Sequence, residues 1–334
     1  MRTLLPALAA LSLWLGAAQA QPVKFAELGI LADAPVYLAI EHGYFREAGI
    51  EVTLERFGSA VQATAPLSTN QVQVAGGAVS AALFNAFARD WPVRIAIGRT
   101  GDRPGFSGDT LVLRPDLRDR MQRIRDLKGL RIAVNAPSAA LHYMLGRMLE
   151  SDGLSIRDVE LVFMPWPSMG PAMETHAIDG GTVVEPFAAL FAQRGQAMPF
   201  RRAADVLRDP PLEVSVILFS LDWANAKPEQ ARAFALGYLR GAREYWQAMR
   251  GGPNRAQVVA LLARRTTMTD PAQYDQAQWS YADPNGDIVL ASLADQQAFF
   301  VSQGSVRTPQ PVERMLDRRF LDAAIAQLGR VATD

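Results

Sequence analysis

The chain has 334 residues and a formal net charge of zero, because 34 basic residues balance 34 acidic ones. This balance gives no support for a surface that binds nucleic acid or anionic lipid. The chain contains no cysteine, which excludes a disulfide framework, a thiolate nucleophile and a cysteine-based zinc site. At this length we expect about two packed lobes, each with its own core.

Residues 1–20 have the pattern of an export leader. Arg2 supplies a charged start, the apolar run from Leu4 to Leu15 is too short to span a bilayer, and Ala18 to Ala20 form a small-x-small cleavage site. We therefore predict a mature chain that begins near Gln21 and lies in the periplasm. No cysteine follows the cut to carry a lipid anchor, so we expect a soluble protein and no lipoprotein. The alternative is an uncleaved membrane anchor.

Short apolar strands alternate with longer helical patterns, which is typical of βαβ units and a mainly parallel sheet. The first helix is expected to run from an Asp33 cap to Gly49, and the clearest helix from Ser138 to Leu149. The predicted class is therefore α/β. Its strands are expected at 23–28, 51–57, 72–75, 93–98, 111–114, 131–135, 160–164, 181–184, 198–201 and 214–221.

The chain is expected to cross between the two lobes twice, near Leu111 and near Val216. This assigns residues 21–111 and 217–334 to lobe 1, and residues 112–216 to lobe 2. Two extended segments would then join the lobes as a hinge.

Three segments carry a resemblance to a known family. They are APVYLAIEHGYFREAGIEVTLERF from Ala34 to Phe57, DLKGLRIAVNAPSAALHYMLGRMLESDGL from Asp126 to Leu154, and METHAIDGGTVVEPFAAL from Met173 to Leu190. They resemble the periplasmic substrate-binding proteins of ABC importers for nitrate, sulfonates, taurine and thiamine precursors, the NMT1/THI5-like or SsuA-like group. The resemblance implies a type II periplasmic binding protein fold, with two βαβ lobes joined by a two-segment hinge. It also implies a monomer without a cofactor that delivers its ligand to an inner-membrane permease and its ATPase.

Ligands of doubly wound sheets sit beyond the carboxyl ends of the strands, where loops lead into helix N-termini. These N-termini offer unpaired N–H groups and a partial positive charge, which suits an oxyanion. The candidate ligand-binding residues at or beside such positions are Asp33, Ala34, Tyr37, Gly58, Ser59, Gly77, Ala78, Ser80, Ser138, Ala139, Ala140, Trp166, Glu185 and Phe187.

Some of these candidates have a second interpretation. Glu185 in the cleft would accept a hydrogen bond from an N–H donor and repel an anion, but it could instead cap the helix after Pro186 or pair with an arginine. Trp166 could stack on a planar ligand or cover the hinge. Ser138 could be a plain N-cap.

We therefore predict the solute-binding protein of an ABC importer, with a sulfonate, nitrate-like, taurine-like or thiamine-pyrimidine-like ligand. The sequence has no Gly-x-Ser-x-Gly elbow and no phosphate loop, so we expect no enzyme. His42, His142 and His176 are scattered, so we expect no metal site. The alternatives are a secreted enzyme with Glu185 as its base, and a ligand sensor that docks to a membrane receptor.

Overall fold

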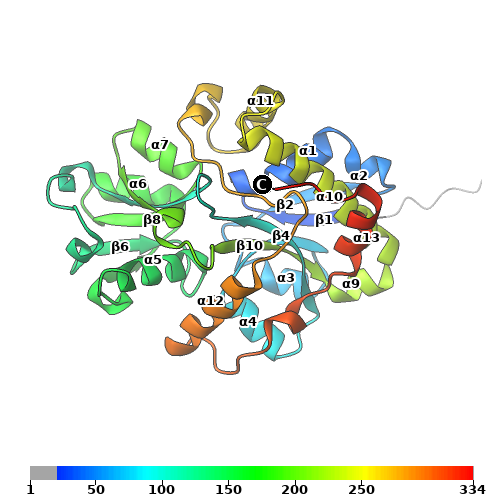
Figure 1. Ribbon diagram of the computed structural model, residues 1–334, viewed down its shortest axis with the longest axis horizontal. Coiled ribbons are helices and arrows are strands. Elements are labelled where there is room, and N and C mark those ends of the chain that lie inside the picture. The colour runs from blue at the N-terminus through cyan, green and yellow to red at the C-terminus, as the bar shows by residue number, and fades with distance from the viewer. Residues whose placement is uncertain (1–20, 334) are drawn as a thin grey trace, which may run out of the picture.

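The computed structural model describes residues 21–333 as two lobes, each built on a five-stranded sheet (Figure 1). The predicted leader, residues 1–20, lies outside the described residues. In lobe 1 the strand order is β2-β1-β3-β10-β4. These strands are β1 (Val23–Glu27), β2 (Val52–Arg56), β3 (Val74–Ala78), β4 (Val93–Gly101) and β10 (Glu213–Ser220).

In lobe 2, the green part at the left of Figure 1, the strand order is β7-β6-β8-β5-β9. Every strand predicted from the sequence is present, with small shifts at the ends. The strands of this lobe are β5 (Asp109–Leu113), β6 (Arg131–Val134), β7 (Glu160–Phe163), β8 (Gly180–Val184) and β9 (Met198–Arg202).

The expectation of mainly parallel sheets is only partly right. The pairs β1–β2, β1–β3, β6–β7 and β6–β8 are parallel. Strand β10 is antiparallel to β3 and β4, and β5 is antiparallel to β8 and β9. The reason is that β5 and β10 each enter their sheet from the other lobe, so they run away from the cleft, whereas strands that lead into a crossover helix run toward it.

The predicted crossings near Leu111 and Val216 fall inside β5 and β10, and each of these strands belongs to one sheet throughout. We propose that the hinge consists of residues 102–108 and 207–212. The two segments touch, because the Asp102 N–H donates to the Leu212 carbonyl at 2.9 Å. The proposed lobe limits therefore move by several residues toward the cleft.

Helices cover both sheets. Lobe 1 carries α1 (Ala34–Glu41), α2 (Tyr44–Glu47), α3 (Thr64–Ser68), α4 (Ala81–Ala88), α9 (Leu221–Ala226), α10 (Pro228–Met249), α11 (Arg255–Arg265), α12 (Leu290–Ser302) and α13 (Arg319–Leu328). Lobe 2 carries α5 (Ala140–Glu150), α6 (Trp166–Glu174), α7 (Phe187–Gln193) and α8 (Ala203–Val206). Short 3-10 turns lie at Leu31–Asp33, Pro115–Leu117, Ile124–Leu127, Ile156–Asp158, Pro271–Asp275 and Val312–Met315.

Two helix predictions are corrected at their ends. The first predicted helix breaks after α1, because Gly43 adopts a left-handed φ of 73° before α2 begins. The helix expected from Ser138 begins at Ala140, with Ala139 as the N-cap, and Ser138 itself has a φ of 51°. Ser138 is therefore not the N-cap.

Within residues 21–333, none of the helices combines the length and the apolar character that a membrane span requires. Helix α12 packs against α4 of lobe 1 and α5 of lobe 2, and so lies across the junction of the lobes (Figure 1). There the Arg147 Nη2 of α5 lies 2.7 Å from the Asp295 Oδ1 of α12.

Candidate functional site

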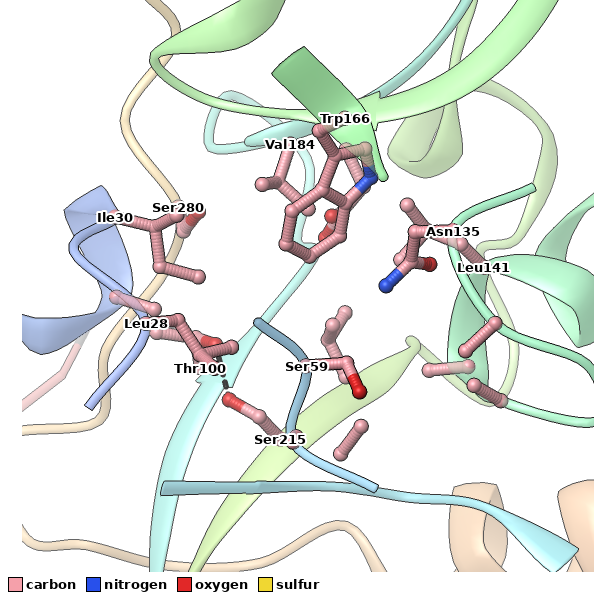
Figure 2. Close-up of a pocket in the computed structure, with 18 of the residues that line it drawn as sticks. Leu28, Ile30, Ser59, Thr100, Asn135, Leu141, Trp166, Val184, Ser215 and Ser280 are labelled. Atoms are coloured by element: carbon pink, nitrogen blue, oxygen red, sulfur yellow. Dashed lines mark hydrogen bonds between the residues drawn. The ribbon is translucent and has the colours of Figure 1, made fainter. Parts of the chain in front are cut away.

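A cavity lies between the lobes, beyond the carboxyl ends of the parallel strands (Figure 2). The empty space between its wall residues, including the opening to solvent, is about 620 Å³. Lobe 1 contributes Leu28, Ile30, Ala32, Ser59, Ala60, Val61, Ala78, Arg99, Thr100, Val214, Ser215 and Ser280. Lobe 2 contributes Asp109, Asn135, Ala136, Ala139, Ala140, Leu141, Trp166, Val184 and Glu185.

Six of the candidates lie in the wall of this cavity: Ser59, Ala78, Ala139, Ala140, Trp166 and Glu185. They follow, or lie at the end of, strands that point at the cleft, which is the position that a doubly wound sheet offers to a ligand. The others lie behind the wall: Asp33, Ala34, Tyr37, Gly58, Gly77, Ser80, Ser138 and Phe187.

The residues behind the wall have structural contacts of their own. Gly77 precedes Ala78 in β3, so it points to the opposite face of the sheet, where an added Cβ would lie 2.3 Å from Leu218. Ser80 caps α4 by accepting the Leu83 N–H at 3.3 Å. Phe187 packs behind Trp166, with their ring centroids 6.0 Å apart.

Three more candidates make hydrogen bonds outside the cavity wall. Tyr37 donates its hydroxyl to Glu27, and burial raises the pKa of Tyr37 above its usual value. The Gly58 N–H donates to the side chain of Gln62 at 3.1 Å. The Ser138 hydroxyl lies 2.8 Å from the Ser305 hydroxyl, and these two residues join the lobes.

Glu185 is buried, and both of its carboxyl oxygens accept main-chain N–H groups. Its Oε2 accepts from Ala189 at 3.1 Å, in the first turn of α7, so the capping alternative is correct. Its Oε1 accepts from Gln278 of lobe 1 at 2.9 Å, so this carboxylate also joins the lobes. Burial raises the pKa of Glu185 to about 7, against the opposite effect of the two N–H donors.

Arg99, which sequence reasoning missed, lines the cavity at the end of β4 and is only 2% exposed. Its Nη2 pairs with the carboxylate of Asp33, which is fully buried. The negative charge of this carboxylate neutralises the guanidinium. Asp33 also accepts the N–H groups of Leu28 and Ile30 at 3.1 Å, so its side chain does not cap α1 as predicted. The Arg99 Nε is buried without a partner.

A second missed feature is a pair of buried acids at the first crossing. The Asp102 Oδ1 accepts the Ser107 hydroxyl at 2.7 Å and the Asp109 N–H at 3.5 Å. Burial raises the pKa of Asp102 to about 6, and burial together with the Asp102 charge raises the pKa of Asp109. In the sequence, only the presence of two aspartates in the glycine-rich stretch at residues 98–109 pointed to this pair.

The remaining polar groups of the wall are few and dispersed. Trp166 begins α6, and its indole Nε1 is buried without a hydrogen-bond partner. Asn135 directs its amide into the cavity, and the hydroxyls of Thr100 and Ser215 lie 2.6 Å apart (Figure 2). A mostly apolar wall with separated polar groups can stack on, orient and enclose a small organic molecule.

Among residues 21–333, no group of three or more histidine, aspartate or glutamate side chains is placed to hold a metal ion.

Solved structures with a similar fold bind small solutes. The alkanesulfonate-binding protein SsuA from Xanthomonas axonopodis, bound to MOPS, is 18% identical, with a TM-score of 0.71 and coverage of 90% of this chain and 100% of that one. The nitrate-binding protein NrtA from Synechocystis is 15% identical, with a TM-score of 0.73 and coverage of 92% and 89%. The architecture is therefore that of a periplasmic binding protein, and the predicted fold is confirmed.

The family follows from the sequence match. A family model described as NMT1/THI5 like matches residues 32–256, and the chain belongs to this family. The nitrate import ATP-binding protein NrtC from Synechococcus elongatus is 28% identical over 238 residues, which cover 67% of this chain. The chain spans 36% of the length of that relative.

Proposed function

We propose that this chain is the solute-binding protein of an ABC importer. It encloses a small polar organic molecule between its lobes and delivers it to an inner-membrane permease, which works with an ATPase. The observation that carries this proposal is the cavity itself, whose wall is contributed by both lobes of a fold whose solved neighbours bind small solutes. A ligand that contacts both lobes stabilises the closed state, and the permease can distinguish that state from the open one.

The enzyme alternative needs Glu185 as a free base, and the structure does not favour it. Both oxygens of Glu185 accept main-chain N–H groups, from Ala189 and from Gln278. A carboxylate held in this way stabilises a helix start and the contact between the lobes. Native mass spectrometry of the protein purified from its host is the decisive experiment, since a transport protein should carry an unmodified small molecule.

Ligand binding is expected to reduce the radius of gyration of the mature protein. The lobes touch through Glu185–Gln278 on one side of the cavity and through Arg147–Asp295 on the other, and both contacts require closure. Small-angle scattering with and without the molecule found by mass spectrometry measures the change. An equal radius at saturation would show that the site is rigid and would contradict the hinge.

Replacing Trp166 by alanine is expected to weaken binding of that molecule by about 1.5–3 kcal/mol, the value of burying a large apolar side chain. Trp166→Phe keeps an aromatic ring and should lose less. Calorimetric titration measures both, with Trp246→Ala as the control, because Trp246 lies on α10 outside the cavity wall. Equal affinities of the Trp166→Ala and parent proteins would remove Trp166 from the site.

We also propose that the protein acts as a monomer in the periplasm after removal of residues 1–20. The intact mass of the protein from a periplasmic extract should correspond to a chain that starts at or near Gln21. A membrane-bound protein that retains Met1 would contradict this.

A further inference from the structure

The cavity wall contains one cation, and that cation is paired. Among residues 21–333, Arg99 is the only basic residue in the wall, and its partner Asp33 is fully buried beside it. The wall also contains two acidic residues, Asp109 and Glu185. The side chains that line the cavity therefore present more carboxyl groups than cations.

The two acidic residues lie side by side at the start of β5 and the end of β8. Asp109 is paired in register with Val184, and the Glu185 N–H donates to the Gly108 carbonyl at 3.0 Å. Behind Asp109 lies Asp102, which is fully buried. Two carboxyls in contact do not both ionise readily, so this pair keeps one proton and one negative charge.

Two further cations act on these acids from outside the wall. Arg202 of β9 lowers the pKa of Glu185 through its charge, but Arg202 is exposed, and burial of Glu185 has the larger and opposite effect. Arg103 donates to the Asp102 and Leu212 carbonyls at 3.0 and 3.2 Å. Its Nη2 lies 3.9 Å from Glu213, another buried acid. An anionic ligand would therefore enter a site that already has a negative balance and low exposure to water, where charge repulsion is poorly screened.

Two buried donors in the wall still need an acceptor. The Trp166 Nε1 and the Arg99 Nε have no hydrogen-bond partner, and both residues are more than nine-tenths buried. A carbonyl oxygen or a ring nitrogen can accept from such a donor without bringing a negative charge into the site. Beside them, the Trp166 ring offers a flat face for stacking.

We infer that the cavity selects a flat, conjugated organic molecule without net negative charge, which directs an N–H donor at Asp109 and an acceptor at Trp166. This specificity rests on the proposed function, because it names the class of ligand for the same cavity. The negative charge that Asp102 and Asp109 share sets the charge preference. Simple oxyanions, such as the sulfonate or nitrate of the structural neighbours, are disfavoured.

Three probes of nearly equal shape test the charge preference. Benzamidine is a cation, benzamide is neutral and benzoate is an anion, and each has one flat ring. On ligand-free mature protein at pH 7.5, we expect benzamide and benzamidine to bind at least about tenfold more tightly than benzoate, as the gain of a charge-assisted contact implies. Ethanesulfonate should also bind weakly. Ligand-observed NMR titration measures all four.

The outcomes separate this inference from the proposed function. Tighter binding of benzoate or ethanesulfonate overturns the inference and leaves a solute-binding protein. If no probe binds, the net charge of the molecule that the protein carries from its host tests the charge preference. An anionic molecule overturns the inference. A neutral or cationic conjugated molecule supports it. If no probe binds and no molecule is carried, both proposals fail.

A double variant assigns the preference to the Asp102–Asp109 pair. Asp102→Asn combined with Asp109→Asn keeps the size of both side chains, removes the charge that the pair shares and should lower the benzamidine-to-benzoate affinity ratio at least about tenfold. Asp116→Asn is the control, since Asp116 is exposed and outside the wall. An unchanged ratio in a folded double variant overturns the role of the pair. If that variant does not fold, the ratio measured on the unaltered protein still decides the charge preference.

Discussion

Replacing Arg99 by methionine is expected to lower the free energy of unfolding by about 3–5 kcal/mol, the cost of leaving a buried charge without its partner. Arg99 is 2% exposed and Asp33 is 0% exposed, so neither water nor another cation can take over the role of the guanidinium. Urea unfolding followed by circular dichroism measures the difference.

A double variant shows whether the uncompensated charge is the cause. Arg99→Met combined with Asp33→Asn removes both charges, and the Asn carbonyl can still accept the N–H groups of Leu28 and Ile30. We expect it to recover most of the lost stability. Arg232→Met removes one partner of an exposed ion pair with Glu229 and should change little. A single Arg99→Met variant as stable as the parent would contradict the argument.

The free energy of unfolding is expected to fall as the pH rises from about 4.5 to about 7. Burial raises the pKa of both Glu185 and Glu213 from 4.5 to about 7, and it also raises the pKa of Asp102 to about 6 and that of Asp109. In this window the folded protein keeps protons that the unfolded chain has released, so rising pH favours unfolding. At about 1.4 kcal/mol per pH unit, each group accounts for up to roughly 3 kcal/mol.

Urea unfolding at several pH values between 4.5 and 8 measures the slope. Groups with a lowered pKa act in another window: the pKa of Asp152 is lowered to about 2 by Arg125, so its effect appears only below the usual aspartate pKa of 3.8. Glu213→Gln cannot titrate and should reduce the slope by about a quarter, since it removes one of the four groups with a raised pKa. Stability that rises between pH 5 and 7 would contradict the assignment.

The fold could be predicted because its signals are local or belong to the family. Most strands have an apolar centre, and the burial of both faces of β5 and β10 explains their apolar runs at residues 111–113 and 216–219. Segments such as the one from Ala34 to Phe57 carry the family resemblance, which the family model confirms. The corrections lie at helix ends, such as the one expected at Ser138. The proposed lobe limits moved because an extended strand and an extended crossing look alike in sequence.

Part of the cavity wall followed from the sequence for the same reason. In parallel α/β sheets the residues just after the strands face the ligand site, and this rule alone predicts that Ser59, Ala78 and Trp166 lie at the wall. The sequence also indicated two uses for Glu185, and the capping use was one of them.

Only the tertiary structure decided which charges are free. Arg99 and Asp33 are 66 positions apart, and their pairing depends on the meeting of β4 with the turn before α1. The burial that raises the pKa values of Asp102 and Asp109 accompanies the contact between residues 102–108 and 207–212. The sequence determined the fold, the family and the region of the site, because these depend on local patterning. The charge inside the cavity was left to the structure, because it depends on burial and on partners distant in the chain.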